Sequence, residues 1–321
     1  MLMYISDSID PVYNLAAEEA IFNRGKSCIF LWRNDNSVII GRNQNIYSQV
    51  NLSAAKKYGT KIVRRNTGGG TVYHDLNNIN FSFCFNEGEY IQEFFTDKIL
   101  SFLHSLNISA EADGRNDIIA NGKKISGCAM MVKNGFMLFH GTLLFSANTP
   151  IMEQLLNVDC DKLRSKGISS VKSRVGSICD YLPKNESAES FMNKLKSFLS
   201  EKFNTENAEL NRYEIEKLVK EKYGTWEWNI GKNPKMNFLN RKRFTAGSIC
   251  INAEIKNGII KECRFTGDFI GKNEIEALEN ALVGTAYKRE TVGGFFRSHN
   301  INNYLGMISE EQWLLLFFPF E

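Results

Sequence analysis

Apolar residues recur along this chain with two different spacings, which predict a mixture of strands and helices. Segments rich in β-branched and aromatic residues predict strands over 1–6, 71–73 and 79–85. Segments with apolar residues three or four positions apart predict helices, because such residues share one helix face. These helices are expected to begin at Pro11 and to lie at 52–58, 91–106, 187–203, 211–223 and 273–282.

Three Asn-Gly pairs mark expected hairpins, because both residue types readily adopt the positive φ that a two-residue turn needs. Asn121-Gly122 and Asn134-Gly135 divide 117–144 into a predicted three-stranded meander. Asn257-Gly258 marks another hairpin within 244–265.

A further hairpin is expected near the N-terminus. Asn34, Asp35 and Asn36 separate the apolar runs 28–32 and 37–41. Asn and Asp favour turns because their side chains hydrogen-bond to the nearby backbone. We therefore expect these two runs to pair with each other.

A change of composition at 224–243 predicts the connection between two domains. This stretch brings together Trp226, Trp228 and several cations, and a new β pattern begins after it. We expect one domain over 1–240 and a small second domain over 244–321 with a β-β-α pattern. Strands and helices are expected in both domains.

Composition narrows the class of protein. The 321 residues are 43% apolar and 23% charged, which is typical of soluble globular domains. The net charge of +3 is small and the two signs are interspersed, so nucleic acid is not an expected partner. Seven widely spaced cysteines favour reduced thiols. Residues 1–10 do not resemble a secretory signal, and no apolar run is long enough to span a membrane, so we expect a cytoplasmic protein without membrane contact.

The most distinctive stretch is a glycine loop that follows two arginines. Arg64 and Arg65 are followed almost at once by Gly68, Gly69 and Gly70. Consecutive glycines can turn their backbone N–H groups toward one anion, and arginine adds paired donors. A tight hairpin corner needs the same glycines. The two arginines favour the anion-binding interpretation.

A second group of candidate residues lies in the predicted meander. Lys124 and His140 fall on neighbouring strands and can reach the same site if both face the glycine loop. Lys123 points to the opposite strand face from Lys124. The small residues Ser126 and Gly127 leave room for a ligand.

Other known catalytic patterns are missing from the sequence. No Walker A motif, G-x-S-x-G elbow or metal-binding spacing among the four histidines is found. Cys128 is open to two interpretations, as a nucleophile or, more commonly, as a small buried apolar residue. The basic, serine-rich stretch 166–174 is either a loop that closes over an anion or a solvated linker.

Four segments together resemble lipoate-protein ligase A. They are R-R-N-T-G-G-G-T-V-Y-H-D (64–75), G-R-N-D-I-I-A-N-G-K-K-I-S-G (114–127), F-H-G-T-L-L (139–144) and K-G-I-S-S-V-K-S-R-V (166–175). The segments N-L-A-A-E-E, G-R-N-Q-N and K-Y-G-T-W-E-W-N-I-G-K-N-P-K-M-N-F are also similar to that family. The resemblance covers essentially the whole chain in order.

The resemblance implies an α+β fold, with a biotin/lipoate-ligase-like catalytic domain of mixed β-sheets flanked by helices and a small α+β C-terminal accessory domain. It also implies a two-step reaction, in which lipoate and Mg-ATP form lipoyl adenylate and pyrophosphate, and the lipoyl group is then transferred to a lysine. The implied acceptors are lipoyl carrier domains of 2-oxoacid dehydrogenase complexes and the glycine cleavage H protein. We expect a monomer.

The resemblance also assigns site residues, with Lys124 as the catalytic residue touching both the lipoyl carbonyl and the α-phosphate. It implies that ATP and the adenylate contact Arg65, Gly69, Gly70, Thr71, Val72, Tyr73, Asn78, Asn116, Asp117 and Lys124. It implies that lipoate contacts Lys124, Ser126 and His140. It implies a closing loop that contains Lys166, Gly167, Ser173, Arg174 and Val175. The Mg²⁺ ligands are not identified.

This chain departs from the family pattern at a few positions. Thr71 replaces a frequent alanine and Cys128 a common serine, and both changes are nearly isosteric. Gly176-Ser177 replaces a frequent Thr-Asn, which makes the closing loop less certain. The rival hypotheses are an octanoyl or lipoyl amidotransferase with a cysteine nucleophile and a non-catalytic protein that binds lipoyl adenylate or a carrier. A biotin ligase with a DNA-binding repressor role is disfavoured, because we find no helix-turn-helix before the first catalytic strand.

Overall fold

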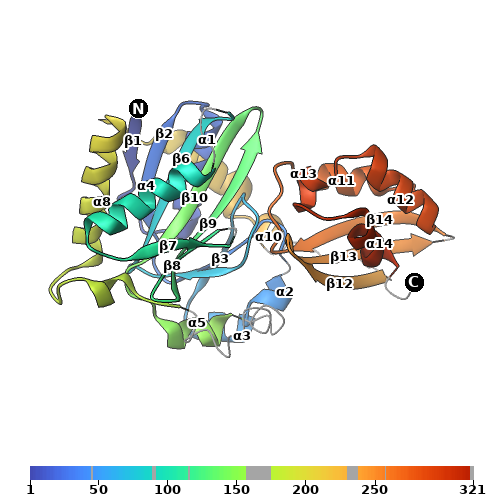
Figure 1. Cartoon of the computed structure of the whole chain (residues 1–321), viewed down its shortest axis with the longest axis horizontal. Coiled ribbons are helices and arrows are strands. Elements are labelled where there is room, and N and C mark those ends of the chain that lie inside the picture. Colours follow the sequence, from blue (N-terminus) through green and yellow to red (C-terminus); the bar gives the residue numbers. More distant parts are fainter. Residues whose placement is uncertain are drawn as a thin grey trace.

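A computed structural model describes residues 1–44, 46–88, 92–114, 116–156, 175–229, 238–256 and 258–318. These residues form a larger N-terminal domain and a smaller C-terminal domain side by side, with the short helix α10 (Trp226–Asn229) between them (Figure 1). Among the described helices, none is both long and apolar enough to cross a membrane.

An eight-stranded mixed sheet is the centre of the larger domain. Its strands are ordered β11-β1-β2-β6-β10-β9-β8-β7. Their bounds are β1 Leu2–Ile5, β2 Cys28–Arg33, β6 Asn78–Asn86, β7 Ala110–Asp113, β8 Asp117–Ala120, β9 Lys123–Lys133, β10 Phe136–Leu144 and β11 Glu206–Asn207. The predicted meander is confirmed as β8-β9-β10. Its turns place Asn121, Gly122, Asn134 and Gly135 at positive φ, as the Asn-Gly pairs predict.

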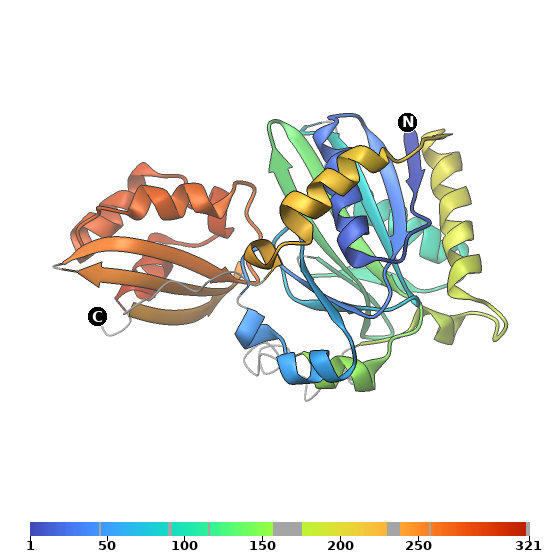
Figure 2. The ribbon, with the colours of Figure 1, turned by 180° about the vertical axis from the view of Figure 1, so that it is seen from behind.

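Helices cover both faces of this sheet. Helices α4 (Gln92–Ser105) and α8 (Ala188–Phe203) lie on one face (Figure 1). The other face carries α1 (Pro11–Asn23) and α9 (Arg212–Leu218), which continues as the π-helical turn η2 (Val219–Tyr223) (Figure 2). Asp10 caps α1 by accepting from the backbone N–H of Val12. The predicted helices of this domain are therefore confirmed in type and position.

Strand β6 shows why both faces are covered. Phe81, Phe83 and Phe85 alternate toward the α4 and α8 side, where each is almost fully buried. Burial of one such side chain contributes about 1.5–3 kcal/mol. Ser82 and Cys84 fall between them, and Cys84 packs in the core under α1. A polar residue such as Ser82 inside this buried strand needs a hydrogen-bond partner.

The hairpin predicted between 28–32 and 37–41 is wrong. Strand β3 (Ser37–Ile40) pairs with β4 (Lys61–Arg64) and β5 (Val72–His74) in a separate three-stranded sheet, whereas β2 pairs with β1 and β6. Asn34 does not form a local turn bond but is buried, with its amide 3.2 Å from Nδ1 of His74. The chain therefore crosses from one sheet to the other at 34–36.

Short helices cover the small sheet. They are α2 (Ile46–Gln49), α3 (Leu52–Lys57) and α5 (Thr149–Leu155). Val38, Ile40 and Leu155 form part of their shared core. The predicted helix at 52–58 is confirmed as α3. The 3-10 turn η1 (Ile178–Tyr181) then leads toward α8.

The C-terminal domain is a three-stranded antiparallel sheet packed with helices. The strands are β12 (Phe238–Phe244), β13 (Gly247–Lys256) and β14 (Ile259–Gly267). The helices are α11 (Ile275–Leu282), α12 (Arg289–Ser298), α13 (Asn302–Leu305) and α14 (Glu310–Phe317). Strand β12 begins at Phe238, earlier than the β pattern that the sequence predicts from residue 244 onward. The reason is pairing, because Phe238 already stands opposite Ala253 of β13.

Backbone and side-chain bonds hold the two domains together at the glycine loop. The N–H of Gly267 donates to the carbonyl of Asn43 at 2.6 Å, and Arg42 pairs with Glu276 of α11 at 3.1 Å. The N–H of Gly69 donates to the carbonyl of Phe269 at 3.3 Å. The C-terminal domain is thus seated directly on the stretch that the sequence singled out.

Candidate active site

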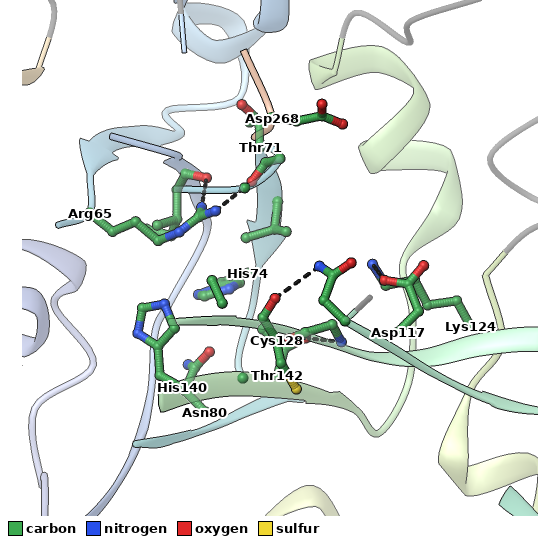
Figure 3. A pocket seen from close by; sticks show the side chains of 18 of the residues that line it. Arg65, Thr71, His74, Asn80, Asp117, Lys124, Cys128, His140, Thr142 and Asp268 are labelled. Carbon is green, nitrogen blue, oxygen red and sulfur yellow. Dashed lines mark hydrogen bonds and ion pairs between the residues drawn. The ribbon is translucent and has the colours of Figure 1, made fainter. Parts of the chain in front are cut away.

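A cavity of about 400 Å³ lies beside the glycine loop, between β9, β10 and the edge of the C-terminal domain. Figure 3 shows Lys124 and Asp117 on one side of it and Arg65, His74 and His140 on the other. We call these the Lys124 end and the His74 end. Apolar side chains that line the cavity include Leu15, Trp32, Ile39 and Val72. The cavity therefore combines apolar walls with groups that can bind charge.

The Lys124 end is built on the β8-β9 hairpin. Nζ of Lys124 lies 2.7 Å from Oδ1 of Asp117, and the Asp117 side chain is only 6% exposed. The pairing register of β8 and β9 shifts between Ile118 and Ile119, and Lys124 stands opposite Ile119. Val175 forms a bridge with Lys124 from the other side. These contacts fix a primary amine at the cavity wall, while the adjacent Lys123 is exposed.

Arg65 shapes the glycine loop from inside. Its side chain is buried, and Nη2 donates to the carbonyls of Gly68 at 2.6 Å and Gly70 at 2.8 Å. Nη1 donates to the carbonyl of Ile39 and Nε to Oγ1 of Thr67. Burial lowers the pKa of Arg65 to about 10, so it stays charged at neutral pH. Arg65 lines the cavity while its guanidinium holds the loop carbonyls.

Gly69 also differs from the arrangement expected of an anion nest. It has φ +87°, which is the left-handed region that glycine adopts at little cost. Its N–H, however, donates to Phe269 of the C-terminal domain. The Gly69 N–H therefore bonds the C-terminal domain and not a ligand in the cavity. Gly69, Gly70 and Thr71 nevertheless line the cavity.

Arg64 is not among the described residues that line the cavity, which corrects the expectation that both arginines serve an anion. Its guanidinium donates to backbone carbonyls on the opposite side of the loop. They belong to Gly41, Arg42, Gln44, Trp228 and Asn229. Burial lowers the pKa of Arg64 to about 10. Arg64 thus ties the connection at 224–229 to the catalytic domain.

Glu18 of α1 is a functional candidate that the sequence analysis missed. Its buried Oε1 accepts from Oγ of Ser82 at 2.5 Å and lies 2.8 Å from Nδ1 of His140. Nε2 of His140 lies 2.7 Å from Oγ1 of Thr67, the same oxygen that accepts from Arg65. All these bonds are satisfied when His140 donates from Nδ1 and accepts from the Thr67 hydroxyl. A continuous chain of hydrogen bonds therefore joins α1 to the glycine loop.

His74 stands at the same end of the cavity, and in the sequence it appears only within the segment 64–75 that carries the family resemblance. Burial, followed by the charges of Arg65 and His140, lowers the pKa of His74 to about 3, so its ring is neutral at physiological pH. The ring packs edge-on against Trp32 with centroids 6.2 Å apart. The signal that could have found these residues is the row of polar positions Asn78, Asn80 and Ser82 in an otherwise apolar strand.

The site residues predicted from the sequence divide into three groups. Those that line the cavity are Arg65, Gly69, Gly70, Thr71, Val72, Asn116, Asp117, Lys124 and His140. Tyr73, Asn78 and Ser126 are buried or packed behind the wall and lie outside the described lining set. Lys166, Gly167, Ser173 and Arg174 fall outside the described residues, and only Val175 of the expected closing loop is described.

Cys128 lines the cavity beside Lys124. Burial raises the pKa of its thiol to about 12, in spite of opposing effects from Ser126 and Lys124. A nucleophilic cysteine needs the thiolate, so this environment opposes covalent catalysis. Among the described residues, no group of three His, Cys, Asp or Glu side chains is placed to hold a metal ion.

The C-terminal domain also contributes to the cavity. Arg243, Thr245 and Asp268 line it from this domain, and Asp268 lies beside Thr71 in Figure 3. Oδ1 of Asp268 accepts from the backbone N–H of Ser248 at 2.6 Å, and Oδ2 is 3.7 Å from Nη1 of Arg243. The site is therefore completed by residues of both domains.

The fold and site define a two-domain α+β enzyme with a partly apolar cavity. Two family models match the chain. The lipoyl protein ligase A/B catalytic domain matches residues 10–200, and the bacterial lipoate protein ligase C-terminus matches residues 233–317. The chain belongs to the lipoate-protein ligase family, and the predicted fold class is confirmed.

Known proteins similar to the chain agree with this assignment. Lipoate-protein ligase LplJ of Bacillus subtilis is 37% identical over 96% of this chain and 97% of its own length. A crystal structure of P. falciparum LipL1 in complex with lipoate has a TM-score of 0.81 at 28% identity and covers 93% of this chain and 94% of that one. A crystal structure of lipoate-protein ligase A bound with ATP has a TM-score of 0.61 at 28% identity, covering 72% of this chain and 98% of that one. The chain is an enzyme of the lipoate-protein ligase class.

Proposed function

We propose that the chain activates lipoate with ATP to lipoyl adenylate, releases pyrophosphate, and transfers the lipoyl group to a lysine of a lipoyl carrier domain. The observation that carries this proposal is the pairing of Lys124 with the nearly buried Asp117 on the wall of a cavity that is also lined by the apolar side chains of Leu15, Trp32, Ile39 and Val72. Such a cavity suits a molecule with an apolar tail and a carboxylate that reacts next to a cation.

The first step requires positive charge around the α-phosphate. A carboxylate oxygen of lipoate attacks the α-phosphorus, the bond to the bridging oxygen breaks, and pyrophosphate leaves with the electron pair. Lys124 would stabilise the charge that develops there, since a preoriented cation in a partly dry site acts strongly on a transition state. Arg243 supplies a second cation from the C-terminal domain, suited to the departing pyrophosphate.

The cavity also fits Mg²⁺ as a companion of ATP. Mg²⁺ in nucleotide sites usually takes one or two carboxylates, with phosphate oxygens and waters as its other ligands. Asp117 and Asp268 line the cavity from the two domains. Asp113 of β7 also lines the cavity and stands opposite Asp117 of β8. One or two of these carboxylates would serve as ligands of the ion beside the phosphate oxygens, and the ion would neutralise charge on the phosphates.

The second step needs a neutral amine from the carrier and no nucleophile from this chain. The amine attacks the acyl carbon of the mixed anhydride, and AMP leaves. The mixed anhydride has to be shielded from water until the amine attacks. The raised pKa of Cys128 supports direct transfer over the cysteine route of an amidotransferase.

The acceptors proposed are lipoyl domains of 2-oxoacid dehydrogenase complexes and the glycine cleavage H protein. A solved structure from Thermoplasma acidophilum has a TM-score of 0.63 at 29% identity. It comes from a structural analysis of a bi-partite lipoate protein ligase and its E2 lipoyl domain. We also propose that the chain acts as a monomer. The described cysteines are free, which supports a cytoplasmic location. We divide the chain into a catalytic domain and an accessory domain that begins near β12.

The experiment that tests this function measures pyrophosphate release from Mg-ATP, with and without lipoate, before any carrier is added. We expect lipoate-dependent release by the wild type, its loss in Lys124→Ala, and retention in the control Lys123→Ala. Absence of release from well-folded wild type would refute activation. Transfer from synthetic lipoyl adenylate would then test whether the second step alone takes place.

A further inference from the structure

One nitrogen in the cavity wall is buried without a hydrogen-bond partner. Nε2 of His74 is inaccessible to solvent and has no partner among the described residues, although His74 lines the cavity. Buried polar atoms in folded proteins are nearly always paired, and an exception in a binding site points to a ligand. The neighbouring polar residues of the His74 end have partners within the protein, since His140 bonds Glu18 and Asn80 bonds Asn78.

Surrounding amides fix which nitrogen of His74 carries the hydrogen. Nδ2 of Asn14 donates to the carbonyls of Ser8 and Arg33, both at 2.9 Å, which sets the orientation of the Asn14 amide. Oδ1 of Asn34 lies 3.0 Å from the same nitrogen, so the two hydrogens of the Asn14 NH₂ group are shared among three oxygens, and the other side of the Asn34 amide is its NH₂ group.

That NH₂ group lies 3.2 Å from Nδ1 of His74. An amide NH₂ can only donate, so Nδ1 must accept. Because the ring is neutral, its single hydrogen is then on Nε2. His74, which is one of the residues lining the cavity, consequently carries its hydrogen on the buried Nε2, and its ring is held by the buried Asn34 and, through it, by Asn14 of α1.

An aromatic ring lies beside His74, and apolar side chains line the same cavity. The Trp32 ring lies edge-on to the imidazole, and Ile39 and Leu15 line the same cavity. The His74 end lies across the cavity from Lys124, where the carboxylate reacts (Figure 3). The far end of the bound acid is therefore what approaches His74.

We propose that Nε2–H of His74 donates to a sulfur atom of the dithiolane ring and thereby selects lipoate over a straight-chain acid such as octanoate. This proposal rests on the proposed function. Sulfur is a weak but real hydrogen-bond acceptor, and it is polarizable enough to pack well against aromatic rings. An alkyl chain of similar length would fill the pocket but leave the N–H unpaired. Leaving a buried donor unpaired is what makes a site reject an analogue that lacks the acceptor.

The test compares kcat/KM for lipoate and for octanoate in pyrophosphate release, in wild type and three variants. His74→Gln can keep a donor near the position of Nε2. His74→Asn reaches only the position of Nδ1, and His74→Phe keeps the ring shape without any donor. Circular dichroism and the midpoint of urea unfolding show which variants are folded.

We expect the wild type to prefer lipoate and His74→Gln to keep most of that preference. His74→Asn and His74→Phe should shift the lipoate-to-octanoate ratio toward octanoate by about tenfold, since one unpaired buried donor costs about 1–3 kcal/mol and 1.4 kcal/mol is a factor of ten. A wild type that uses both acids equally, or variants that lower both activities equally, would overturn the proposal. Failure of the proposed function is a different outcome, in which the wild type releases pyrophosphate with neither acid.

Discussion

Oε1 of Glu18 lies 2.8 Å from Nδ1 of His140, and the opposite nitrogen of the same ring lies 2.7 Å from Oγ1 of Thr67 in the glycine loop. The next residue of α1, Glu19, accepts from Nδ2 of Asn66 at 2.9 Å. Two consecutive glutamates of α1 thus hold two consecutive residues at the start of the glycine loop. The conformation of the loop depends on a helix that is distant in sequence.

Removal of the Glu18 carboxylate should destabilise the protein. Glu18→Ala leaves the buried donors of His140 and Ser82 without their acceptor, which we expect to lower the free energy of unfolding by about 3 kcal/mol. Glu18→Gln keeps an acceptor oxygen and should cost about 1 kcal/mol. Urea unfolding measures both. Glu216→Ala, an exposed glutamate on α9, is the control, and an equally small change in Glu18→Ala would contradict the role of the network.

Arg243 should serve the activation step and not the transfer step. Its side chain is 26% exposed and reaches the cavity from β12, where ATP would bring its phosphates. Arg243→Ala is expected to raise KM for ATP by about tenfold, the typical effect of losing one charge-assisted hydrogen bond. The measurement is pyrophosphate release over a range of ATP concentrations.

Arg241 offers a matched control, because it lies on the same strand but outside the described cavity lining. Arg241→Ala should leave KM for ATP unchanged. Transfer from preformed lipoyl adenylate should be normal in both variants. Equal loss of activation and transfer in Arg243→Ala would show that the residue acts on the fold or on the carrier instead of on ATP.

Cys128→Ser should have little effect on either step. Burial raises the pKa of this thiol to about 12, so almost none of it is thiolate at neutral pH. We expect activity within about twofold of wild type, because serine is nearly isosteric and no covalent intermediate is needed. Mass spectrometry of the protein with lipoate and ATP should detect no lipoyl adduct on Cys128. Complete loss of ligation in a folded Cys128→Ser variant would favour the amidotransferase mechanism.

The burial of neutral His74 should make stability depend on pH. The pKa of His74 falls from its ordinary value of 6.5 to about 3, so between these values the unfolded chain binds a proton that the folded chain does not. The contribution of neutral His74 to the free energy of unfolding is therefore fully present above pH 6.5. It decreases as the pH falls through this window, by up to about 1.4 kcal/mol per pH unit.

His74→Gln removes this titration while leaving other ionisable groups in place. Urea unfolding of wild type and variant at several pH values between about 4 and 6 should give a shallower slope for the variant. The slopes are compared, not the absolute stabilities, because the substitution also alters packing. Identical slopes would show that His74 takes up its proton equally in the folded and the unfolded chain. His74 would then be charged in the folded protein at this pH, which would also remove the basis for a neutral ring with its hydrogen fixed on Nε2.

Local patterns in the sequence predicted most of the secondary structure. The helices α1, α3, α4, α8, α9 and α11 follow apolar residues at helical spacing, and the β8-β9-β10 meander follows two Asn-Gly pairs. These signals are reliable because turn geometry and one buried face are set by neighbouring residues. The motifs also led to Lys124, Asp117 and the glycine loop, all of which line one cavity.

What the sequence alone determined is thus the type and order of the elements, the family, and the residues with unusual local chemistry. Only the tertiary structure decided that β2 and β3 belong to different sheets, that Arg64 holds the connecting segment, and that the Gly69 N–H bonds the C-terminal domain. Those outcomes depend on partners far away in the chain. A buried donor such as Nε2 of His74 takes its meaning from Asn34 and Asn14, which come next to it only after α1 has packed against both sheets.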